Sequence, residues 1–244
     1  MIDFDNPENL KPQKKEFTVN NKTISRTVAL TGLIAYNRKG KATVEKVNSF
    51  PQSCTTMFDY DEHGNMIHQQ VSTGLEYWIK YDDFGNKTYM RTSNGDEVLY
   101  EYDEAGNCIY SRSSRGFEMQ YRYNSKNQKI FEFNSRFSEI TLYQYDRNNN
   151  FIRSITSDGV VTKNTYDSNN NLVLTVTSGG TVEYYEYDDK GNMTYSVMGE
   201  LFHEEIDVED FQLDLSKLKQ METFFEYDFY PDGSIQRQYV YETQ

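Results

Sequence analysis

Apolar and polar residues alternate along short segments that recur through most of the chain. A clear example is Tyr100-Glu101-Tyr102, in which two aromatic side chains flank a charged one. In the other copies the residue two before the second tyrosine is also aromatic or aliphatic, except at Asn164, and the residue between them is polar. A strand with one buried and one solvated face produces this period of two. The pattern therefore predicts β-strands with the tyrosines on the buried face.

The second tyrosine of each segment recurs at an almost fixed interval. Seven copies follow one another at spacings of 21 or 22 residues, and an eighth comes 40 residues later. These anchoring tyrosines are Tyr60, Tyr81, Tyr102, Tyr123, Tyr145, Tyr166, Tyr187 and Tyr227. A fixed interval of roughly 20 to 50 residues marks a repeat architecture. The chain is therefore better described in repeats than in domains.

Turn-forming residues separate the predicted strands. Most anchoring tyrosines precede an aspartate, two variable residues and Gly-Asn, as in Asp103 to Asn107. Aspartate can accept hydrogen bonds from backbone N–H groups two residues on, and glycine supplies a positive φ. Asparagine, which tolerates a positive φ best among the other residues, replaces glycine at Asn149 and Asn170. A second set of turns, such as Asn94-Gly95, carries strong hairpin signals, so each repeat reads as two strands and two turns.

Seven to eight such repeats exceed the roughly 10 strands that an open twisted sheet holds before it curls. We therefore expect an all-β fold, a curved, repeat-built antiparallel sheet shaped as a half-shell or spiral strip, with one short helical insertion. Residues 1–50 are predicted to form an N-terminal arm and atypical capping β-hairpins, and residues 51–244 the repeat array. Apolar residues among acidic ones interrupt the array at about 199–223, and the spacing of Leu215, Leu218 and Met221 predicts a short helix near 214–222.

Composition and charge narrow the class of protein and of partner. The 21 tyrosines and 15 phenylalanines supply apolar area that a hydrophobic fraction of 36% understates. No apolar run is long enough to cross a bilayer and no secretory signal begins the chain, so we expect a cytoplasmic protein and no membrane partner. Residues 183–228 hold fourteen acidic residues against three lysines, or −11 of the total charge of −13. This imbalance disfavours nucleic acid and favours a protein partner with a basic surface.

The repeats resemble the YD repeats of Rhs and teneurin proteins and of the C subunits of insecticidal toxin complexes. The matching copies run from Tyr60-Asp61 with Gly64-Asn65 to Tyr187-Asp188 with Gly191-Asn192, and the resemblance covers about residues 58–241. In that family the repeats form a long antiparallel strip that spirals into a hollow shell or stands as a barrel. The resemblance implies the strand-and-turn unit. The chain has too few repeats to enclose a protein and lacks a recognisable toxin tail and autoproteolytic core.

The sequence shows no constellation of residues for catalysis and none for a cofactor or metal. The three histidines are not paired with cysteines at ligand spacing, and no phosphate-binding loop or nucleophile motif is present. We therefore expect a protein that is not an enzyme and has no cofactor. Two candidate surfaces remain. The predicted partner-binding residues are Glu200, Glu204, Glu205, Asp207, Glu209 and Asp210, and the predicted aromatic ligand surface comprises Trp78, Tyr89, Tyr110, Phe131 and Tyr195.

Three functions agree with these features. The first is a non-enzymatic repeat scaffold that binds another protein, in a bacterial or phage toxin- or defence-related context. The second is a carbohydrate-binding module that uses exposed aromatic side chains. The third is an immunity or anti-defence protein that neutralises a basic partner through its acidic C-terminal section.

Overall fold

The computed structural model describes residues 10–19, 21–49, 52–201, 206–215 and 221–243. These residues form nineteen β-strands and, within the described ranges, no α-helix. The strands in chain order are β1 (Gln13–Val19), β2 (Lys22–Tyr36), β3 (Ala42–Ser49), β4 (Gln52–Tyr60), β5 (Met66–Val71), β6 (Glu76–Tyr81), β7 (Lys87–Thr92), β8 (Glu97–Tyr102), β9 (Cys108–Ser113), β10 (Glu118–Tyr123), β11 (Lys129–Asn134), β12 (Glu139–Tyr145), β13 (Phe151–Thr156), β14 (Val161–Tyr166), β15 (Leu172–Thr177), β16 (Thr181–Tyr187), β17 (Met193–Glu200), β18 (Met221–Phe229) and β19 (Ile235–Thr243). In this part of the chain no helix is long and apolar enough to span a membrane.

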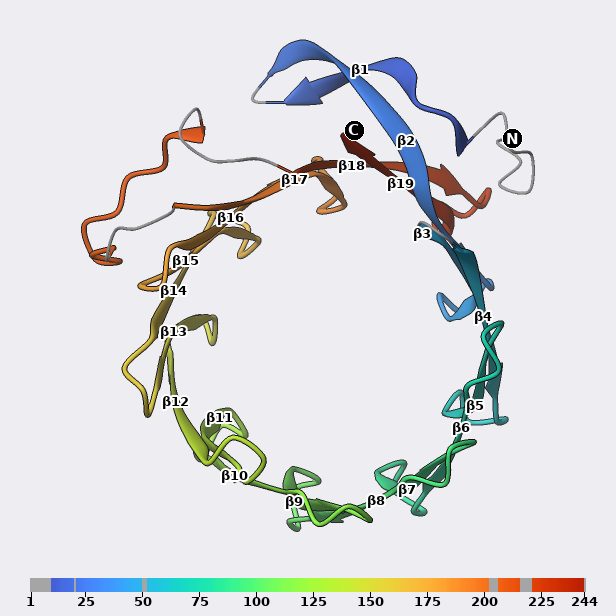
Figure 1. The fold of residues 1–244 in the computed structure, drawn as a ribbon, viewed down its shortest axis with the longest axis vertical. Helices are drawn as coiled ribbons and strands as arrows, with labels where there is room; N and C mark the ends of the chain where they lie inside the picture. The colour runs from blue at the N-terminus through green and yellow to red at the C-terminus, as the bar shows by residue number, and fades with distance from the viewer. Residues whose placement is uncertain (1–9, 20, 50–51, 202–205, 216–220, 244) are drawn as a thin grey trace.

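The strands β2 to β19 close into a ring (Figure 1). Each pairs antiparallel with the next strand in sequence, and β19 returns to pair with β2 from Arg237↔Ala35 to Thr243↔Val28. The long strand β2 belongs both to the ring and to a hairpin outside it. Its first half forms a hairpin with β1, which lies outside the ring, and its second half lies between β19 and β3.

The predicted open half-shell or spiral strip is therefore wrong, because the sheet is a closed antiparallel barrel. Its last strand finds a partner in the N-terminal segment that the sequence suggested as an end cap, so the ring of β2 to β19 itself has no open edge. The predicted short helical insertion near 214–222 is also wrong in the described residues. Strand β18 already begins at Met221, residues 206–214 are irregular, and residues 216–220 lie outside the described part of the chain.

The turns that follow the anchoring tyrosines have the predicted chemistry. In the turn after Tyr81, Asp82 Oδ1 accepts from the backbone N–H groups of Phe84 at 3.0 Å and Asn86 at 2.8 Å, and Oδ2 accepts from Asn86 Nδ2 at 3.0 Å. Gly85 has φ +83°, and the asparagines that replace it elsewhere also have positive φ, +70° at Asn149. Aspartate and glycine thus fix the turn for the reasons expected from sequence.

Each anchoring tyrosine also ties its repeat to the preceding one. Its hydroxyl donates to the backbone carbonyl of the residue that follows the preceding Tyr-Asp turn, as from Tyr81 to Met66 at 2.8 Å. The same bond is made by Tyr60, Tyr102, Tyr123, Tyr145, Tyr166, Tyr187 and Tyr227 at 2.8–2.9 Å. The nearly constant 21-residue interval therefore matches a constant bond between neighbours around the ring.

The two faces of the sheet have different surroundings. The Tyr-Asp turns curl toward the axis of the ring, while the hairpin of β1 and β2 and the segment 206–215 lie outside it (Figure 1). These outside segments pack on Phe224 and Val182, which alternate with the tyrosine positions, so the anchoring tyrosines point inward. We call the opposite side of the ring's sheet the outer face. On the inner side, Ile67 and Ile109 stay 39% and 38% exposed, since barrels of about 16 to 18 strands are too wide for side chains to fill.

The buried core lies under the two outside segments. Beneath the hairpin, Phe17 stacks on Phe224 with ring centroids 3.9 Å apart, and Tyr241 is fully buried. Two ion pairs, Lys15–Glu226 at 2.7 Å and Arg26–Glu222 at 2.6 Å, join the hairpin to β18. Under the second segment, Val176 and Val182 pack against Val208. Both segments therefore act as covers for the outer face.

Candidate functional site

The outer face is covered along one part of the ring and bare along another. On β15 to β19 many of its side chains are buried, with Val182 and Phe224 at 0% exposure. On β6 to β13 the same face exposes large apolar side chains, with Leu99 at 59% and Leu142 at 48%. Trp78 and Ile140 on this face are also exposed. Exposed apolar patches of this kind mark interaction sites in soluble proteins, so the bare part of the outer face is a candidate site.

Four of the five predicted aromatic residues lie on this bare part. Trp78, Tyr89, Tyr110 and Phe131 come from β6, β7, β9 and β11. Each lies across the sheet from a different partner, for example Tyr89 from Lys80 and Leu99. They are therefore spread along the wall and do not form one cluster.

The fifth predicted aromatic residue, Tyr195, has a different environment. It is on the outer face of β17 but only 2% exposed, packed between Tyr184 and Phe224 under the hairpin. Its hydroxyl donates to Glu222 at 3.1 Å, and burial raises its pKa. The structure thus places Tyr195 in the core, away from any ligand surface.

Trp78 belongs to a polar cluster that joins three strands. The ring of His68 on β5 stacks on Trp78 with centroids 5.5 Å apart. Its Nδ1 lies 3.0 Å from Asp59 Oδ2 on β4, and its Nε2 lies 2.9 Å from Glu76 Oε2 on β6. These hydrogen bonds, first that to Asp59 and then that to Glu76, raise the pKa of His68. Both ring nitrogens have carboxylate partners, so the arrangement suits an imidazolium that bridges the strands.

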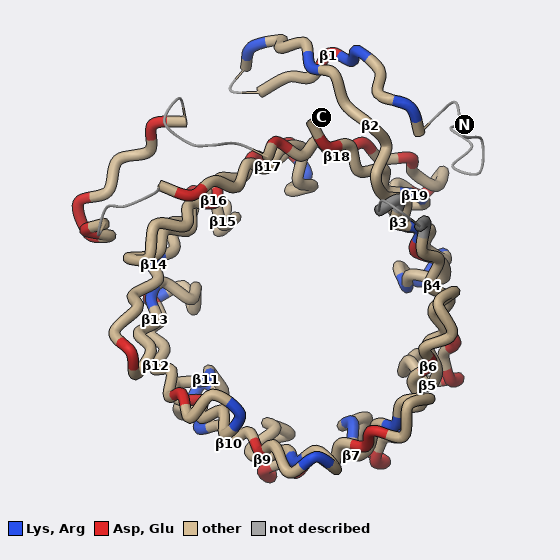
Figure 2. Tube along the Cα trace, in the orientation of Figure 1, with Lys and Arg blue, Asp and Glu red and all other residues tan. Residues whose placement is uncertain are grey.

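The predicted acidic surface lies outside the ring between β17 and β18 (Figure 2). Glu200 ends β17, and Asp207, Glu209 and Asp210 are exposed on the segment that follows, while Glu204 and Glu205 lie outside the described residues. The carboxylate of Glu209 contacts Lys163 Nζ at 3.0 Å and Arg153 Nε at 3.5 Å. Part of the acidity is therefore paired with two basic residues of the chain's own outer face.

The contact of Glu209 with Arg153 and Lys163 on the outer face was not predicted from the sequence. Arg153 and Lys163 lie opposite one another on β13 and β14, and Lys163 lies opposite Val176. The segment places Glu209 on the basic pair and the buried Val208 against Val176. The aligned repeats do show that Arg153 is unusual, because it occupies the position held by aromatic residues in earlier copies, Tyr89, Tyr110 and Phe131. The partner of that arginine is 56 residues away, so no local pattern pointed to it.

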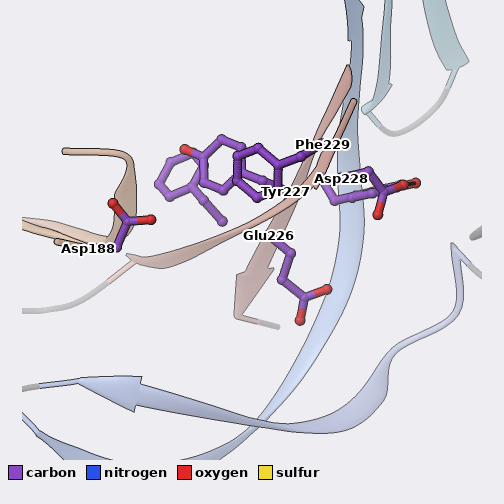
Figure 3. A pocket seen from close by; sticks show the side chains of 7 residues that line it. Asp188, Glu226, Tyr227, Asp228 and Phe229 are labelled. Atoms are coloured by element: carbon purple, nitrogen blue, oxygen red, sulfur yellow. Dashed lines mark hydrogen bonds between the residues drawn. The ribbon is translucent and has the colours of Figure 1, made fainter. Parts of the chain in front are cut away.

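An open cavity of about 440 Å³ lies where the last repeat departs from the regular interval (Figure 3). Its lining includes Asp188, Glu226, Tyr227, Asp228 and Phe229, and the carboxylates of Glu226 and Asp228 point away from that of Asp188. Their polar groups are engaged elsewhere. Asp228 accepts from the Tyr239 hydroxyl at 2.7 Å, Glu226 pairs with Lys15, and Tyr227 donates to a backbone carbonyl. The cavity therefore presents no convergent set of acid, base and nucleophile.

Metal binding has no support among the residues that the structure describes. No group of three or more His, Cys, Asp or Glu side chains there could hold a metal ion. Cys54 and Cys108 are both free thiols, and burial raises the pKa of Cys108. The bare outer face of β6 to β13 therefore remains the candidate site.

Comparisons with known proteins show similarity to solved structures only. No protein-family model matches the chain, and no curated protein matches its sequence. The chain is similar to the crystal structures of TcdB2-TccC3-TEV and TcdB2-TccC3, at 14% and 15% identity, each with a TM-score of 0.40. It covers 13% of those chains, while 91% and 90% of this chain is matched. It is also similar to a porin-like protein from Bacteroides uniformis, at 11% identity and a TM-score of 0.45, over 88% of this chain and 95% of the other. These TM-scores lie below 0.5, so the matches assign neither family nor function.

Proposed function

We propose that the chain is a non-enzymatic repeat scaffold that binds another protein through the bare outer face of β6 to β13. One observation carries the proposal. The same face that the chain covers with its own segments on β15 to β19 is left open here, with Leu99 and Leu142 about half exposed. Burial of the exposed apolar side chains of this region against a partner would likewise be favourable, at roughly 25 cal/mol per Å² of apolar area removed from water.

The residues around the open face suit a protein partner. Arg122 lies over the ring of Phe131 at 4.7 Å, and Arg136 lies over the ring of Phe117 at 5.3 Å. Aromatic residues and arginine are enriched at the centres of protein interfaces, where they supply most of the binding energy. The tyrosine bonds between repeats hold the strands in fixed register, which makes the wall a preorganised surface.

A carbohydrate-binding function is a second candidate, favoured by Trp78. Its indole is 40% exposed, and the carboxylate of Glu76 lies on the same strand face next to it. An exposed aromatic ring beside a hydrogen-bonding carboxylate can stack on a sugar and bond its hydroxyls. The spread of the other aromatic residues over separate strands favours the protein scaffold instead.

The acidic section offers a third candidate, neutralisation of a basic partner by an immunity or anti-defence protein. Glu200, Asp207 and Asp210 are exposed and could contact such a partner, whereas Glu209 is held by Arg153 and Lys163. We propose a cytoplasmic location, as expected from the lack of an apolar run long enough to cross a bilayer, and a toxin- or defence-related setting, which rests on the sequence resemblance alone.

The experiment compares partner capture by three forms of the protein. Wild type, the double variant Leu99→Glu/Leu142→Glu and the single variant Met57→Glu are used as bait in extracts of the native organism. Met57 is 50% exposed and holds the same position in its repeat, but lies on β4 outside the proposed surface. We expect wild type and Met57→Glu to retain one protein that the double variant loses, with saturable binding of the purified partner.

Other results would favour another function. Retention of every partner by the double variant would refute the proposed surface. Loss of the partner from Asp207→Asn/Asp210→Asn, with strong salt dependence, would favour the acidic section. Glycan binding that is abolished by Trp78→Ala would favour the carbohydrate-binding module.

A further inference from the structure

We propose that the outer face of β10 to β14 docks a short irregular segment of a partner protein in which acidic and apolar residues are interleaved. This inference rests on the proposed function and specifies the chemistry of the partner. Its basis is a segment of the same type in this chain, Ile206 to Phe211, which is already seated at the edge of that surface.

The seated segment shows how the outer face holds such a peptide. Val208 is 7% exposed and packs against Val176 and Val182 on β15 and β16. The next residue, Glu209, reaches Lys163 and Arg153 on β14 and β13, and Lys163 Nζ also donates to the Glu209 carbonyl at 3.1 Å. Neighbouring positions of the sheet thus contact one apolar and one acidic side chain of the segment.

The apolar surface continues beyond that seat. Val161 on β14 packs against the same cluster, and Ile155 on β13 lies directly opposite Val161. Leu142 on β12 lies opposite Ile155, and Phe131 on β11 lies opposite Leu142. This row runs from a covered region into one where Leu142 is 48% exposed. The bare surface is therefore continuous with an interface that the protein already makes.

The charge of this surface is opposite to that of the protein as a whole. The outer-face positions of β10 to β14 carry Arg122, Arg153 and Lys163 against one acid, Glu118, in a chain of net charge −13. Glu209 pairs with Arg153 and Lys163, and Glu118 lies 3.9 Å from Arg112 on β9, which leaves the exposed Arg122 at the far end of the apolar row. A partner segment with acidic residues complements the surface, and its charge would also speed encounter.

The test measures binding of a fluorescent peptide with the sequence of residues 206–215 to the intact protein. Fluorescence anisotropy is recorded for wild type, Leu142→Glu, Arg122→Glu and the matched control Met57→Glu. A second peptide has its acidic residues replaced by Asn and Gln. We expect saturable binding that weakens about tenfold or more in Leu142→Glu and Arg122→Glu, a change typical of losing one central contact. Met57→Glu should bind like wild type, and the neutral peptide should bind less tightly and with less salt dependence.

Several outcomes would overturn the inference. The first two are absence of binding and equal binding by the neutral peptide. The third is binding that Leu142→Glu leaves unchanged but Val182→Glu abolishes, because the peptide would then only displace the chain's own segment. Dimers in sedimentation that Leu142→Glu dissociates would assign the surface to a second copy instead. If the captured protein partner still depends on Leu142 while the peptide fails to bind, the inference fails and the proposed function stands. If no partner depends on Leu99 or Leu142, the proposed function itself fails.

Discussion

Tyr102 donates its hydroxyl hydrogen to the backbone carbonyl of Lys87 at 2.8 Å, and this bond repeats around the ring with each anchoring tyrosine. The phenol crosses from its own strand to the residue after the preceding turn. Burial raises the pKa of Tyr102 to about 12, as expected for a phenol withdrawn from water. The tyrosine of the repeat is thus a hydrogen-bonding link between units as well as an apolar side chain.

Replacing this hydroxyl should cost stability without changing the fold. Tyr102→Phe removes the donor and leaves the Lys87 carbonyl short of a partner, which costs about 1 kcal/mol. Tyr100→Phe is the matched control, because Tyr100 lies two residues away on the same strand face and its ring contact with Lys87 survives in phenylalanine. Urea unfolding followed by circular dichroism measures both. Equal effects of the two substitutions would contradict the role assigned to the bond.

The stability of the wall near β5 should depend on the charge of His68. Its hydrogen bonds to Asp59 and Glu76 raise its pKa above the value of about 6.5 expected in the unfolded chain. Because the folded pKa is the higher one, this stabilisation is fully present below pH of about 6.5 and is lost as pH rises through the folded pKa. We therefore expect His68→Gln to reduce the free energy of unfolding at acidic pH more than at mildly alkaline pH.

The measurement is a series of urea unfolding curves across that pH range. His63→Gln, in an exposed turn, serves as the control for removing one histidine. A loss in His68→Gln that is constant with pH would mean that packing against Trp78, at 5.5 Å, accounts for the contribution of His68.

Two glycines with similar backbone angles should tolerate alanine differently. Gly180 has φ +97°, and a Cβ there would lie 2.7 Å from the carbonyl oxygen of Leu201, where the segment that covers the outer face begins. Gly95 has φ +83° with nothing within 4 Å of its Cβ position. Gly95→Ala should cost about 1 kcal/mol from backbone strain alone. Gly180→Ala should cost more and should loosen the segment.

Thermal unfolding gives the stability difference, and limited proteolysis near residues 201–215 reports on the segment. If Gly180→Ala were no worse than Gly95→Ala and no more sensitive to protease, Leu201 would not be held against Gly180. The 2.9 Å hydrogen bond from Leu201 N to Gly180 O would then not fix the start of the segment.

The repeat unit could be predicted from sequence because its determinants are local. Tyr81, Asp82, Gly85 and Asn86 lie within six residues and specify strand end, turn and return. Closure of the ring could not be predicted in this way. The pairing of β2 with β19 joins residues about 200 apart, such as Ala35 and Arg237, and no local pattern encodes it. The helix predicted from three apolar residues failed because Met221 belongs to a strand instead.

The candidate site was partly visible in the sequence for the same reason. Alternation along a strand accounts for the position of Trp78 and Tyr110 on the side of the sheet opposite the anchoring tyrosines. It could not reveal that Tyr195, at an equivalent position, is covered by the β1–β2 hairpin, because that contact is tertiary. Nor could it show that Glu209 folds back on Lys163.

Closure of the ring can be tested by whether one substitution raises or lowers the stability of the protein. Gly32 on β2 lies opposite Val240 on β19, and a Cβ on Gly32 would sit 3.3 Å from both Cβ and Cγ2 of Val240. Its backbone carries no positive φ, so alanine is not strained by conformation there. In an open sheet Gly32→Ala would stabilise the protein by about 0.4–1 kcal/mol, because alanine reduces the entropy of the unfolded chain. In the closed ring it should instead destabilise by about 1 kcal/mol or more through overpacking.

A double-mutant cycle separates crowding at the closure from any other effect of the alanine. Val240→Ala removes Cγ2, one of the two Val240 atoms that the new Cβ would meet, and leaves Cβ with room to shift, at the cost of a small cavity. In the background of Val240→Ala, Gly32→Ala should be less destabilising than in wild type, so the two substitutions should show a favourable coupling energy of at least about 0.5 kcal/mol. Urea unfolding of all four proteins measures that coupling. Additive effects, or a stabilising Gly32→Ala in the wild-type background, would show that β2 and β19 are not in contact in solution.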